Sequence, residues 1–299
     1  MKPVTTLLLS LLFVTFFFAC TPVKKEGPQV VAPAAKTRLN VAKTSLKNKK
    51  EKVMDVPPVL GGLVQSDSWI IYKDKQEEEF KGNVSYDNGS YQFKADYALS
   101  QRAQHLFTAR GHVFLRQNEP DGSFYEVHSD NARFNYQTQR GTLSANAKNK
   151  ITLIFQDEKK QLSKAYAKKV SFDLITKIFV LEGNVYMERT SQQGTHTLQA
   201  DKVTFKQLEN YALLEGNAKL SDGERTLEAQ VIEYDGQHDS SSATGSRPLA
   251  YGKTEQGTFA IIADKVESDA SGNVIHLDGK VQGWVVSPQL NDEKINSKF

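Results

Sequence analysis

The residues that could do chemistry in this chain are four aspartates that each follow a small residue: Asp96, Asp130, Asp201 and Asp264. Carboxylates at regular intervals could form a ladder of calcium sites or supply paired acids for hydrolysis. Two further copies of the same pattern carry lysine or glutamine at this position, and no second acid follows two residues later. We therefore expect each aspartate to bond the backbone of its own turn rather than to bind metal.

The histidines give no catalytic or metal-binding pattern either, and they lie at positions 105, 112, 128, 196, 238 and 276. No pair has the spacing of metal ligands with cysteine or carboxylate neighbours. The chain also lacks a nucleophile elbow, a P-loop and a dinucleotide-binding fingerprint. We expect no cofactor, no metal and no enzymatic activity. A glycan-active β-helix enzyme stays open as an alternative, and it would need a groove lined with acidic residues.

The single cysteine of the chain, Cys20, ends an apolar N-terminal segment. Lys2 precedes an apolar run from Leu7 to Ala19, which is shorter than the ~20 residues that span a bilayer and is typical of a secretory signal. A small residue followed by cysteine at this point resembles a bacterial lipobox, although Phe17-Phe18 departs from its usual residues. The resemblance implies a signal peptide over residues 1–20 and a lipidated Cys20 that anchors the chain. An ordinary signal peptide with an incidental cysteine is the alternative.

Residues 21–62 form a lysine- and proline-rich segment with little apolar surface, which predicts a disordered tether. Its lysines either lie against anionic lipid headgroups or serve solubility. The net charge of the chain is +3 and its hydrophobic content is 39%. These values indicate neither a nucleic-acid partner nor disorder in the remainder of the chain.

Six segments of constant length organise the rest of the sequence. Each begins at a small residue, usually followed by aspartate, and ends at a glycine or alanine 16 positions later. The segments are Ala95–Gly111, Ser129–Ala145, Ala167–Gly183, Ala200–Gly216, Ala229–Gly245 and Ala263–Gly279. A partial seventh copy covers residues 80–86. Constant units joined by connections of variable length indicate a repeat architecture.

Each unit has the pattern of two strands joined by a polar turn. Apolar residues alternate toward the end of the unit, as in Phe179, Leu181, Val185 and Met187, which predicts antiparallel strands with one buried face. A one-residue slip in this alternation predicts a bulge or bend at the aspartate. We expect one all-β domain over residues 63–287 with roughly 13–16 strands, followed by a polar tail over 288–299.

The glycine that ends most units shares the parity of its apolar neighbours, so we expect it to point inward. A column of such glycines would bend successive strands alike and line a trough between two sheets. The alternative is that a narrow core has no room for a side chain at this position.

Several segments resemble the LptC and LptA (OstA-like) family of periplasmic lipopolysaccharide transport proteins. Residues 94–97 (KADY), 110–113 (RGHV) and 129–139 (SDNARFNYQTQ) resemble LptC. Residues 181–185 (LEGNV), 200–205 (ADKVTF) and 214–218 (LEGNA) are similar to LptA. The resemblance covers about residues 80–285, closer to LptC in the first half and to LptA in the second.

The resemblance implies an elongated, open, V-shaped antiparallel β-jellyroll that receives the acyl chains of lipid A. It also implies a bridge in which Lpt-type jellyroll proteins join through open strand edges, fed by an inner-membrane ABC exporter. The chain would then lie on the periplasmic face of the envelope, anchored at Cys20 in the inner or the outer membrane. Many LptC proteins have a transmembrane helix instead, and this body is longer than a typical LptC.

The alternation of apolar and polar residues predicts which side chains line the trough. In the competing interpretation, about half of these side chains only fill the core between the sheets. The predicted positions are Phe107, Val113, Leu115, Leu143, Phe179, Leu181, Val185, Met187, Phe205, Leu214, Leu220, Leu277, Val281 and Val285. A structural lipoprotein that scaffolds envelope partners without carrying lipid is the second functional hypothesis.

Overall fold

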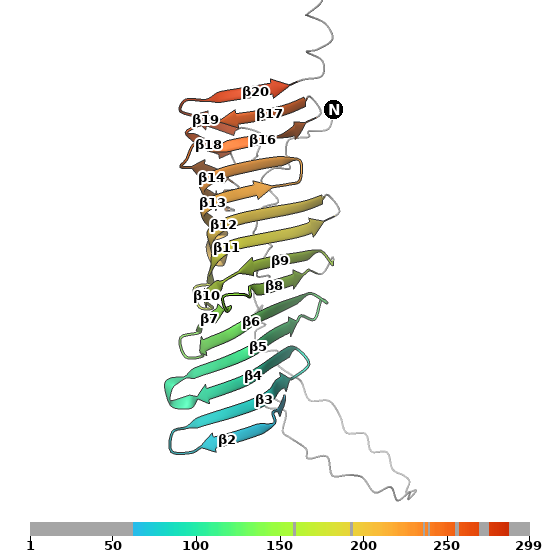
Figure 1. Cartoon of the computed structure of the whole chain (residues 1–299), viewed down its shortest axis with the longest axis vertical. Coiled ribbons are helices and arrows are strands. Elements are labelled where there is room, and N and C mark those ends of the chain that lie inside the picture. Colours follow the sequence, from blue (N-terminus) through green and yellow to red (C-terminus); the bar gives the residue numbers. More distant parts are fainter. Residues whose placement is uncertain are drawn as a thin grey trace, which may run out of the picture. The chain divides into compact units, whose positions relative to one another are not determined.

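Antiparallel β-strands make up nearly all of the chain that the computed structural model describes, which is residues 62–157, 160–191, 194–235, 237–238, 240–254, 257–268 and 275–286 (Figure 1). Two short 3-10 turns interrupt them, η1 (Arg102–Gln104) and η2 (Gln207–Glu209). The strands are β1 (Leu63–Gln65), β2 (Ser68–Tyr72), β3 (Glu77–Asp87), β4 (Tyr91–Gln101), β5 (Leu106–Asn118), β6 (Phe124–Asn135), β7 (Arg140–Ser144), β8 (Ile151–Gln156), β9 (Leu162–Ala167), β10 (Lys169–Asp173), β11 (Ile178–Ser191), β12 (Gly194–Lys206), β13 (Tyr211–Ser221), β14 (Arg225–Asp235), β15 (Ser240–Thr244), β16 (Leu249–Thr254), β17 (Gly257–Ile262), β18 (Lys265–Ser268), β19 (Ile275–Asp278) and β20 (Gln282–Val286).

Six pairs of these strands are halves of one longer strand that is broken near its middle: β1 and β2, β7 and β8, β9 and β10, β15 and β16, β17 and β18, and β19 and β20. The pairing shows this directly, because β6 pairs with β7 through one half and with β8 through the other. If each broken strand is counted once, the described residues contain fourteen strands, and each of these is called a pass below. This number lies within the predicted range. The all-β, antiparallel fold built from repeated two-strand units is confirmed.

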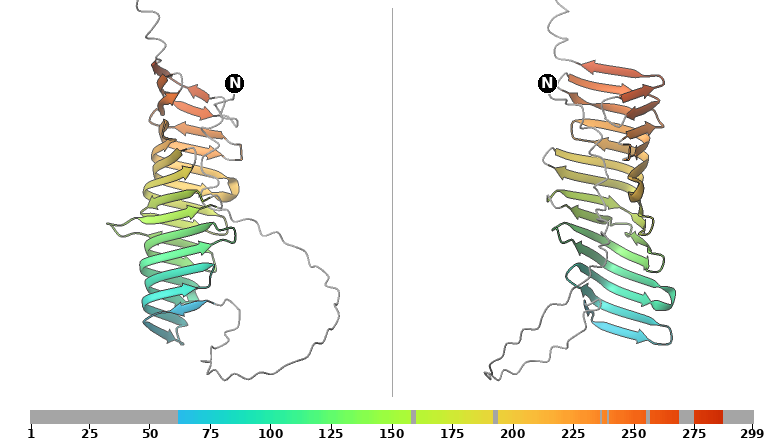
Figure 2. Two further views of the ribbon diagram at one scale, coloured as in Figure 1. Left: turned by 90° about the vertical axis from the view of Figure 1, so that its right-hand side faces the viewer. Right: turned by 180° about the vertical axis from the view of Figure 1, so that it is seen from behind.

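Each unbroken long strand bends near its middle, at the level where the other strands are broken. This line of bends and breaks divides the sheet into two arms. Arm A contains β2, β7, β10, β15, β18 and β19, with the halves of the long strands that pair with them. Arm B contains β1, β8, β9, β16, β17 and β20, with the other halves. The line of bends that separates the arms is called the seam below. Figure 2 shows the two layers of strands.

A bulge marks the seam in every unbroken pair of strands. Between β4 and β5, for example, the register shifts after Lys94 and Arg110, and the β5 side carries one more residue than the β4 side. The two β5 residues at this point, Gly111 and His112, both have left-handed backbone conformations, with φ of 71° and 44°. Glycine adopts such angles without strain, and asparagine and histidine tolerate them better than most residues. The predicted bulge at the aspartate is confirmed.

The expectation that the repeated glycine points inward is wrong. A β-carbon on Gly111 would lie 2.8 Å from the β-carbon of Asp96 on the neighbouring strand, and one on Gly216 would lie 2.9 Å from that of Asp201. The side chain of Asp96 is largely exposed. Two successive left-handed residues therefore turn the glycine toward the outer aspartate rather than toward the interior.

The aspartate bonds the neighbouring strand at the seam instead of its own turn, which corrects a second expectation. Asn217 Nδ2 donates to Asp201 Oδ2 at 2.9 Å, and His112 Nδ1 lies 2.8 Å from Asp96 Oδ2. Asp130 accepts from the backbone N–H of Asn146 at 2.6 Å. Each pair is separated by 16 positions. The fixed length of the unit is therefore the distance along the chain between two residues that meet at the seam.

The seventh unit is complete rather than partial. Asn83 Nδ2 donates to Asp67 Oδ2 at 3.0 Å, again across 16 positions. Ser66 and Asp67 thus supply the small residue and the aspartate that precede Gly82.

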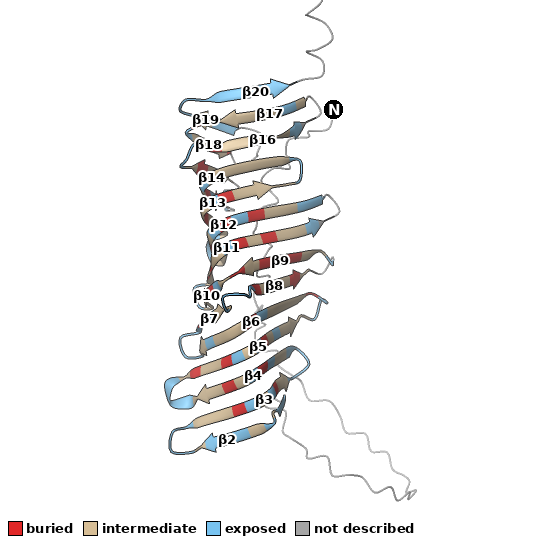
Figure 3. Ribbon diagram, viewed as in Figure 1, coloured by how far each residue is buried: buried red, intermediate tan, exposed pale blue. Residues whose placement is uncertain are grey.

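The inner faces of the two arms pack against each other to form the core (Figure 3). One large cluster joins residues from both arms between Ile151 and Ala243, including Leu181 in arm A and Met187 in arm B. Two smaller clusters lie in β3–β6, around Phe80 and Ala109. The apolar core is therefore larger in the second half of the repeat.

The predicted signal peptide (1–20) with Cys20, residues 21–61 of the predicted tether and the predicted tail (288–299) lie outside the described residues. Among the residues that are described, no helix has the length and apolar character needed to cross a membrane.

Candidate functional site

Cross-strand pairing places inner side chains in rows that run from strand to strand. Register fixes which residues lie opposite each other, so one inward residue per strand makes a continuous row. The inner row of arm A contains Trp69, Phe80, Ala98, Ala109, Ala132, Leu143, Val170, Leu181, Val203, Leu214, Ile232, Ala243, Val266 and Leu277.

Arm B has a matching row on its inner face. It contains Tyr86, Phe93, Leu115, Val127, Leu153, Ala165, Met187, Leu198, Leu220, Leu227, Ala250 and Ile261. The two rows make an apolar inner surface that continues through both halves of the repeat, on both sides of the break between β7 and β8.

The predicted trough positions lie in three environments. Seven are buried: Val113, Phe179, Leu181, Val185, Met187, Phe205 and Leu214. Four are partly buried, namely Phe107, Leu143, Leu220 and Leu277. Leu115, Val281 and Val285 are exposed. Burial at the first seven positions means that these side chains contact other core residues of the chain. Contact of any predicted position with lipid stays a prediction.

The predicted trough positions leave out inner residues from the opening halves of the units and from the strand halves just before them. Leu198 and Ile232 are fully buried in the large cluster, and Val203 lies opposite Leu181. Their signal was present in the sequence, because they alternate with polar residues just as the chosen positions do. At the seam the inward positions of these strands change from odd to even residue numbers or the reverse. For this reason the sequence pattern did not show that these residues belong to the same inner rows.

Aromatic side chains lie on the inner face of arm A, near the strand ends that are farthest from the seam. These strand ends are called the outer margin of the arm. Phe107 lies opposite Phe134, and Phe179 lies opposite Phe205. Phe134 also stacks with Phe172, with ring centroids 6.1 Å apart, above Gly141, which has no side chain to separate them. This margin is therefore apolar along the middle of the arm.

The corresponding margin of arm B is charged over β9–β14. Arg189 follows Met187 by two residues, and His196 precedes Leu198 by two, so both face the interior near the strand ends. Arg189 donates to Gln161 Oε1 at 2.7 Å and lies 3.8 Å from Asp157. The sequence reasoning did not identify this charged margin.

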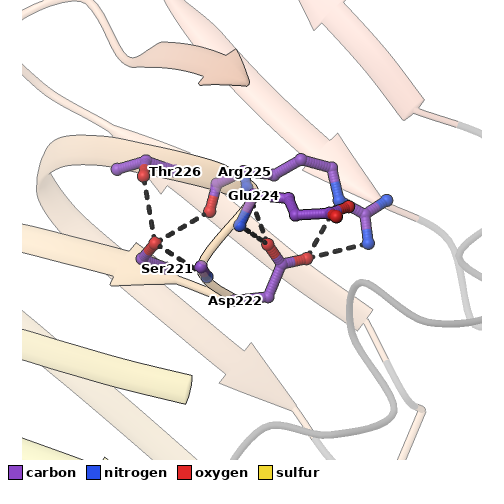
Figure 4. Close-up of polar contacts among 6 residues, drawn as sticks. Ser221, Asp222, Glu224, Arg225 and Thr226 are labelled. Atoms are coloured by element: carbon purple, nitrogen blue, oxygen red, sulfur yellow. Dashed lines mark hydrogen bonds and ion pairs between the residues drawn. The ribbon is translucent and has the colours of Figure 1, made fainter. Parts of the chain in front are cut away.

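Arg225 closes the same margin at the β13–β14 turn (Figure 4). Its guanidinium lies 2.8 Å from Asp222, whose carboxylate also accepts from the backbone N–H groups of Glu224 and Arg225 at 3.0 and 2.7 Å. Burial of the His196 ring lowers its pKa, Asp222 opposes this shift, and the positive charge of Arg189 adds to it. The margin therefore carries opposite charges that neutralise one another.

The residues first considered for chemistry do not come together. Each seam aspartate lies on the outer side of its own pair of strands, bonded to the neighbouring strand. Within the described ranges, no three histidine, cysteine or acidic side chains gather where they could hold a metal ion.

The first and last passes present apolar side chains at the two ends of the sheet. In the described residues, β1 and β2 pair with β3 alone, while β19 pairs with β18 and β20 with β17. Trp69 and Ile71 are exposed on the first pass, as are Trp284 and Val285 on the last. Strands of this kind offer free backbone hydrogen-bonding groups to another strand.

Comparison with known proteins finds a match to one family model. Residues 63–207 match the family model described as LptA/(LptD N-terminal domain) LPS transport protein. The match covers just under half of the chain, and over these residues the sequence is similar to that family. The resemblance to the Lpt family is thereby confirmed, while the finer assignment of the first half to LptC stays a prediction. The matched segment runs from β1 into η2, so it covers β3–β6 and part of the large core cluster.

One solved structure that the chain matches is LptH from Pseudomonas aeruginosa, described as the LptA homologous periplasmic component of the conserved lipopolysaccharide transport device. The two sequences are 13% identical, and the match covers 52% of this chain and 82% of that chain with a TM-score of 0.23. A TM-score this low lends no weight to an argument about function. No curated protein matches the chain.

Proposed function

We propose that the chain is a periplasmic carrier in lipopolysaccharide export that holds the acyl chains of lipid A between its two arms. The observation that carries the proposal is the continuous apolar inner surface of both arms, found in a chain whose residues 63–207 match a lipopolysaccharide transport family. Acyl chains are suited to such a surface because each buried methylene contributes about 0.8 kcal/mol. The chain would act by binding and transfer, without catalysis.

The open strand edges support a role in a bridge. A partner of the same fold would add its terminal strand to β1–β2 or to β19–β20, so that backbone hydrogen bonds continue from one protein to the next. The exposed Trp69 and Trp284 would then become buried in the two junctions. Other Lpt-type jellyroll proteins and an inner-membrane ABC exporter are the partners proposed on this basis.

Lipidation of Cys20 is the proposed means of attachment to a membrane. A diacylated cysteine supplies two chains, which is enough for stable anchoring where a single chain is marginal. The lysine- and proline-rich segment after it would let the carrier reach away from that membrane. Labelling with a radioactive or alkyne-tagged fatty acid tests this, and the Cys20→Ala variant should lose the label.

Site-specific photo-cross-linking tests the carrier function. The soluble form from Thr21 onward would carry a photoreactive residue at Leu115 on the inner face, or at Lys202 on the outer face. After exposure to lipopolysaccharide and light, we expect an adduct at an inner position and none at Lys202. Folded protein that gives no inner adduct would contradict the proposal and favour the scaffold hypothesis.

A charge on the inner face gives an independent test. Leu115→Asp places a carboxylate among the proposed acyl chains at a position that is already 42% exposed, so the fold should tolerate it. We expect reduced capture of lipopolysaccharide, measured by co-purification. The matched variant Phe114→Asp lies on the opposite face of the same strand and should capture lipid normally.

A further inference from the structure

We infer that acyl chains enter and reside in one section of the interior, between the arms over β3–β6, and that the section over β8–β14 stays closed. This inference rests on the proposed function and specifies where in the chain it operates. Four features of the described residues support it: the size of the inner side chains, an aromatic pair between the arms, the distribution of burial, and the charged margin.

Three neighbouring alanines make the inner surface of arm A shallow in β4–β6. Ala98, Ala109 and Ala132 lie opposite one another in successive strands of the inner row. Phe80 and Leu143 occupy the same row on either side of them. The row therefore has small side chains over three strands, with larger side chains on either side; these three positions are called the depression below. From Leu143 to Ile232, each position of this row holds leucine, valine or isoleucine.

An aromatic pair covers this depression. Phe93 projects from arm B and Phe107 from arm A, and their rings meet edge to face with centroids 5.4 Å apart. Both rings pack against the two small clusters that contain Ala98 and Ala109. Each phenylalanine is only partly buried, so its outer side faces solvent. Rotation of these two side chains would open the space above the alanines without separating any strands.

Residues of arm B on either side of Phe93 are exposed. Leu115 is next to Phe93 in the inner row of arm B, and it is 42% exposed. Tyr91, two residues before Phe93 on the same face, is 43% exposed. These side chains provide an apolar path from solvent to the aromatic pair.

The section over β8–β14 is more deeply buried. Met187 and Leu198 occupy the same arm B row as Leu115, but they are 1% and 0% exposed. They pack against Leu181 and other bulky arm A residues in the large cluster. An acyl chain could enter here only by separating arms that are already in close contact.

The charged margin closes this section from outside. Arg189 and Arg225 are tied to Asp157 and Asp222, with His196 between them on β12. A hydrocarbon chain that crossed this margin would remove paired charges from water without replacing their contacts, which is unfavourable. The open section has apolar or uncharged residues, such as Tyr91 and Gln117, at the equivalent positions.

Photo-cross-linking at two positions of the same row tests the inference. The soluble form from Thr21 onward would carry the photoreactive residue at Leu115 in the open section or at Leu227 in the closed section, with Lys94 as the outward control. Circular dichroism and urea unfolding would establish that each variant is folded. With lipopolysaccharide, we expect an adduct at Leu115 and only the background level of Lys94 at Leu227.

Filling the depression should prevent loading. Ala132→Leu adds side-chain volume beside Ala109, and loss of room for two methylenes should weaken the Leu115 adduct on the order of tenfold. The matched variant Ala250→Leu adds the same volume to the inner row of arm B near the last pass and should leave the adduct unchanged. Phe107→Leu removes one ring of the aromatic pair that covers the alanines and should strengthen the adduct. This variant still tests the inference if Ala132→Leu does not fold.

The possible results separate the inference from the function on which it rests. Equal adducts at Leu115 and Leu227, or an adduct at Leu227 alone, would overturn the inference while leaving the carrier function intact. Folded protein with no adduct at either position would contradict both. An Ala132→Leu variant that folds and cross-links at the normal level would also overturn the inference.

Discussion

At the scale of single residues, Gly216 and Asp201 show what the constant spacing of the repeat measures. The two residues belong to neighbouring strands and meet where both strands bend. The aspartate bonds the asparagine that follows the glycine, and it occupies the space where a side chain on Gly216 would lie. A left-handed φ of 75° adds a second reason for glycine at this position.

Gly216→Ala should therefore destabilise the protein. The new β-carbon would lie 2.9 Å from the β-carbon of Asp201, in a backbone conformation that alanine avoids. We expect a loss of about 1–3 kcal/mol in the free energy of unfolding, measured by urea denaturation followed by circular dichroism.

A double variant separates the two causes. Asp201→Ala removes the crowding but keeps the left-handed φ, so Gly216→Ala should cost less in that background than in the native one. Equal costs in the two backgrounds would show that the backbone conformation alone accounts for the loss.

His196 should make stability depend on pH. Burial and the charge of Arg189 lower its pKa in the folded protein, with Asp222 opposing the shift. The unfolded chain then binds the proton more readily, so the contribution is complete above the unfolded pKa of about 6.5 and is lost as pH falls below it. His196→Gln should reduce the decline in urea midpoint between about pH 7 and pH 5. An unchanged decline would show that His196 does not cause it.

At the scale of elements, the broken strand at the centre of the repeat replaces a bulge with a loop. Residues 145–150 connect β7 to β8, and Lys168 takes the place of the aspartate on the neighbouring strand. Its ammonium donates to the carbonyl of Ala147 at 2.7 Å and to that of Asn149. From the other side, Asp130 accepts from Asn146 and Asn149. The seam is thus kept by side chains where the strand itself is interrupted.

Lys168→Met should loosen this loop. Loss of its two hydrogen bonds should cost about 0.5–1.5 kcal/mol each at most, and amide hydrogen exchange over residues 145–150 should become faster. Lys169→Met is the matched control, because Lys169 bonds Glu182 on the outer surface at 2.9 Å and does not contact the loop. Equal effects of the two variants on loop exchange would contradict the role of Lys168.

The strand pattern and the bulge could be predicted from the sequence because both follow from alternation along one strand. The seventh unit was harder to see, since Ser66-Asp67 lies beside the proline-rich segment and its glycine partner is 16 residues away in β3. The direction in which Gly111 points could not be inferred from the sequence. The rule that every second residue points inward holds only for extended backbone, and Gly111 and His112 are both left-handed. The charged margin of Arg189, His196 and Arg225 depends on which strand ends lie next to each other. The pattern of residues along a single strand does not show which strands are neighbours.

At the scale of the whole described β-structure, stability should vary along the repeat. Each pass contacts mainly the passes on either side, so stability approximates a sum of local terms and neighbour contacts. The large cluster lies between Ile151 and Ala243, whereas the first and last passes expose Trp69, Ile71 and Trp284. The middle passes should therefore open least often.

Hydrogen exchange under native conditions measures this variation. We expect the slowest amide exchange in β11–β13, and faster exchange in β2–β4 and in β17–β20. Added lipopolysaccharide should slow exchange in β3–β6 more than in β11–β13 if acyl chains reside in the open section. Uniform exchange from β2 to β20 would indicate one cooperative unit instead.

The order of pairing also bears on how the chain is assembled. Every long strand pairs with the strand just before it, and the broken strands pair within the same short stretch of sequence. Loop closure over such short distances costs little entropy, and local contacts favour fast folding. A chain emerging from the ribosome or from a translocation channel can therefore add each new strand to an edge that is already in place. Folding can then keep pace with delivery of the chain, one hairpin at a time.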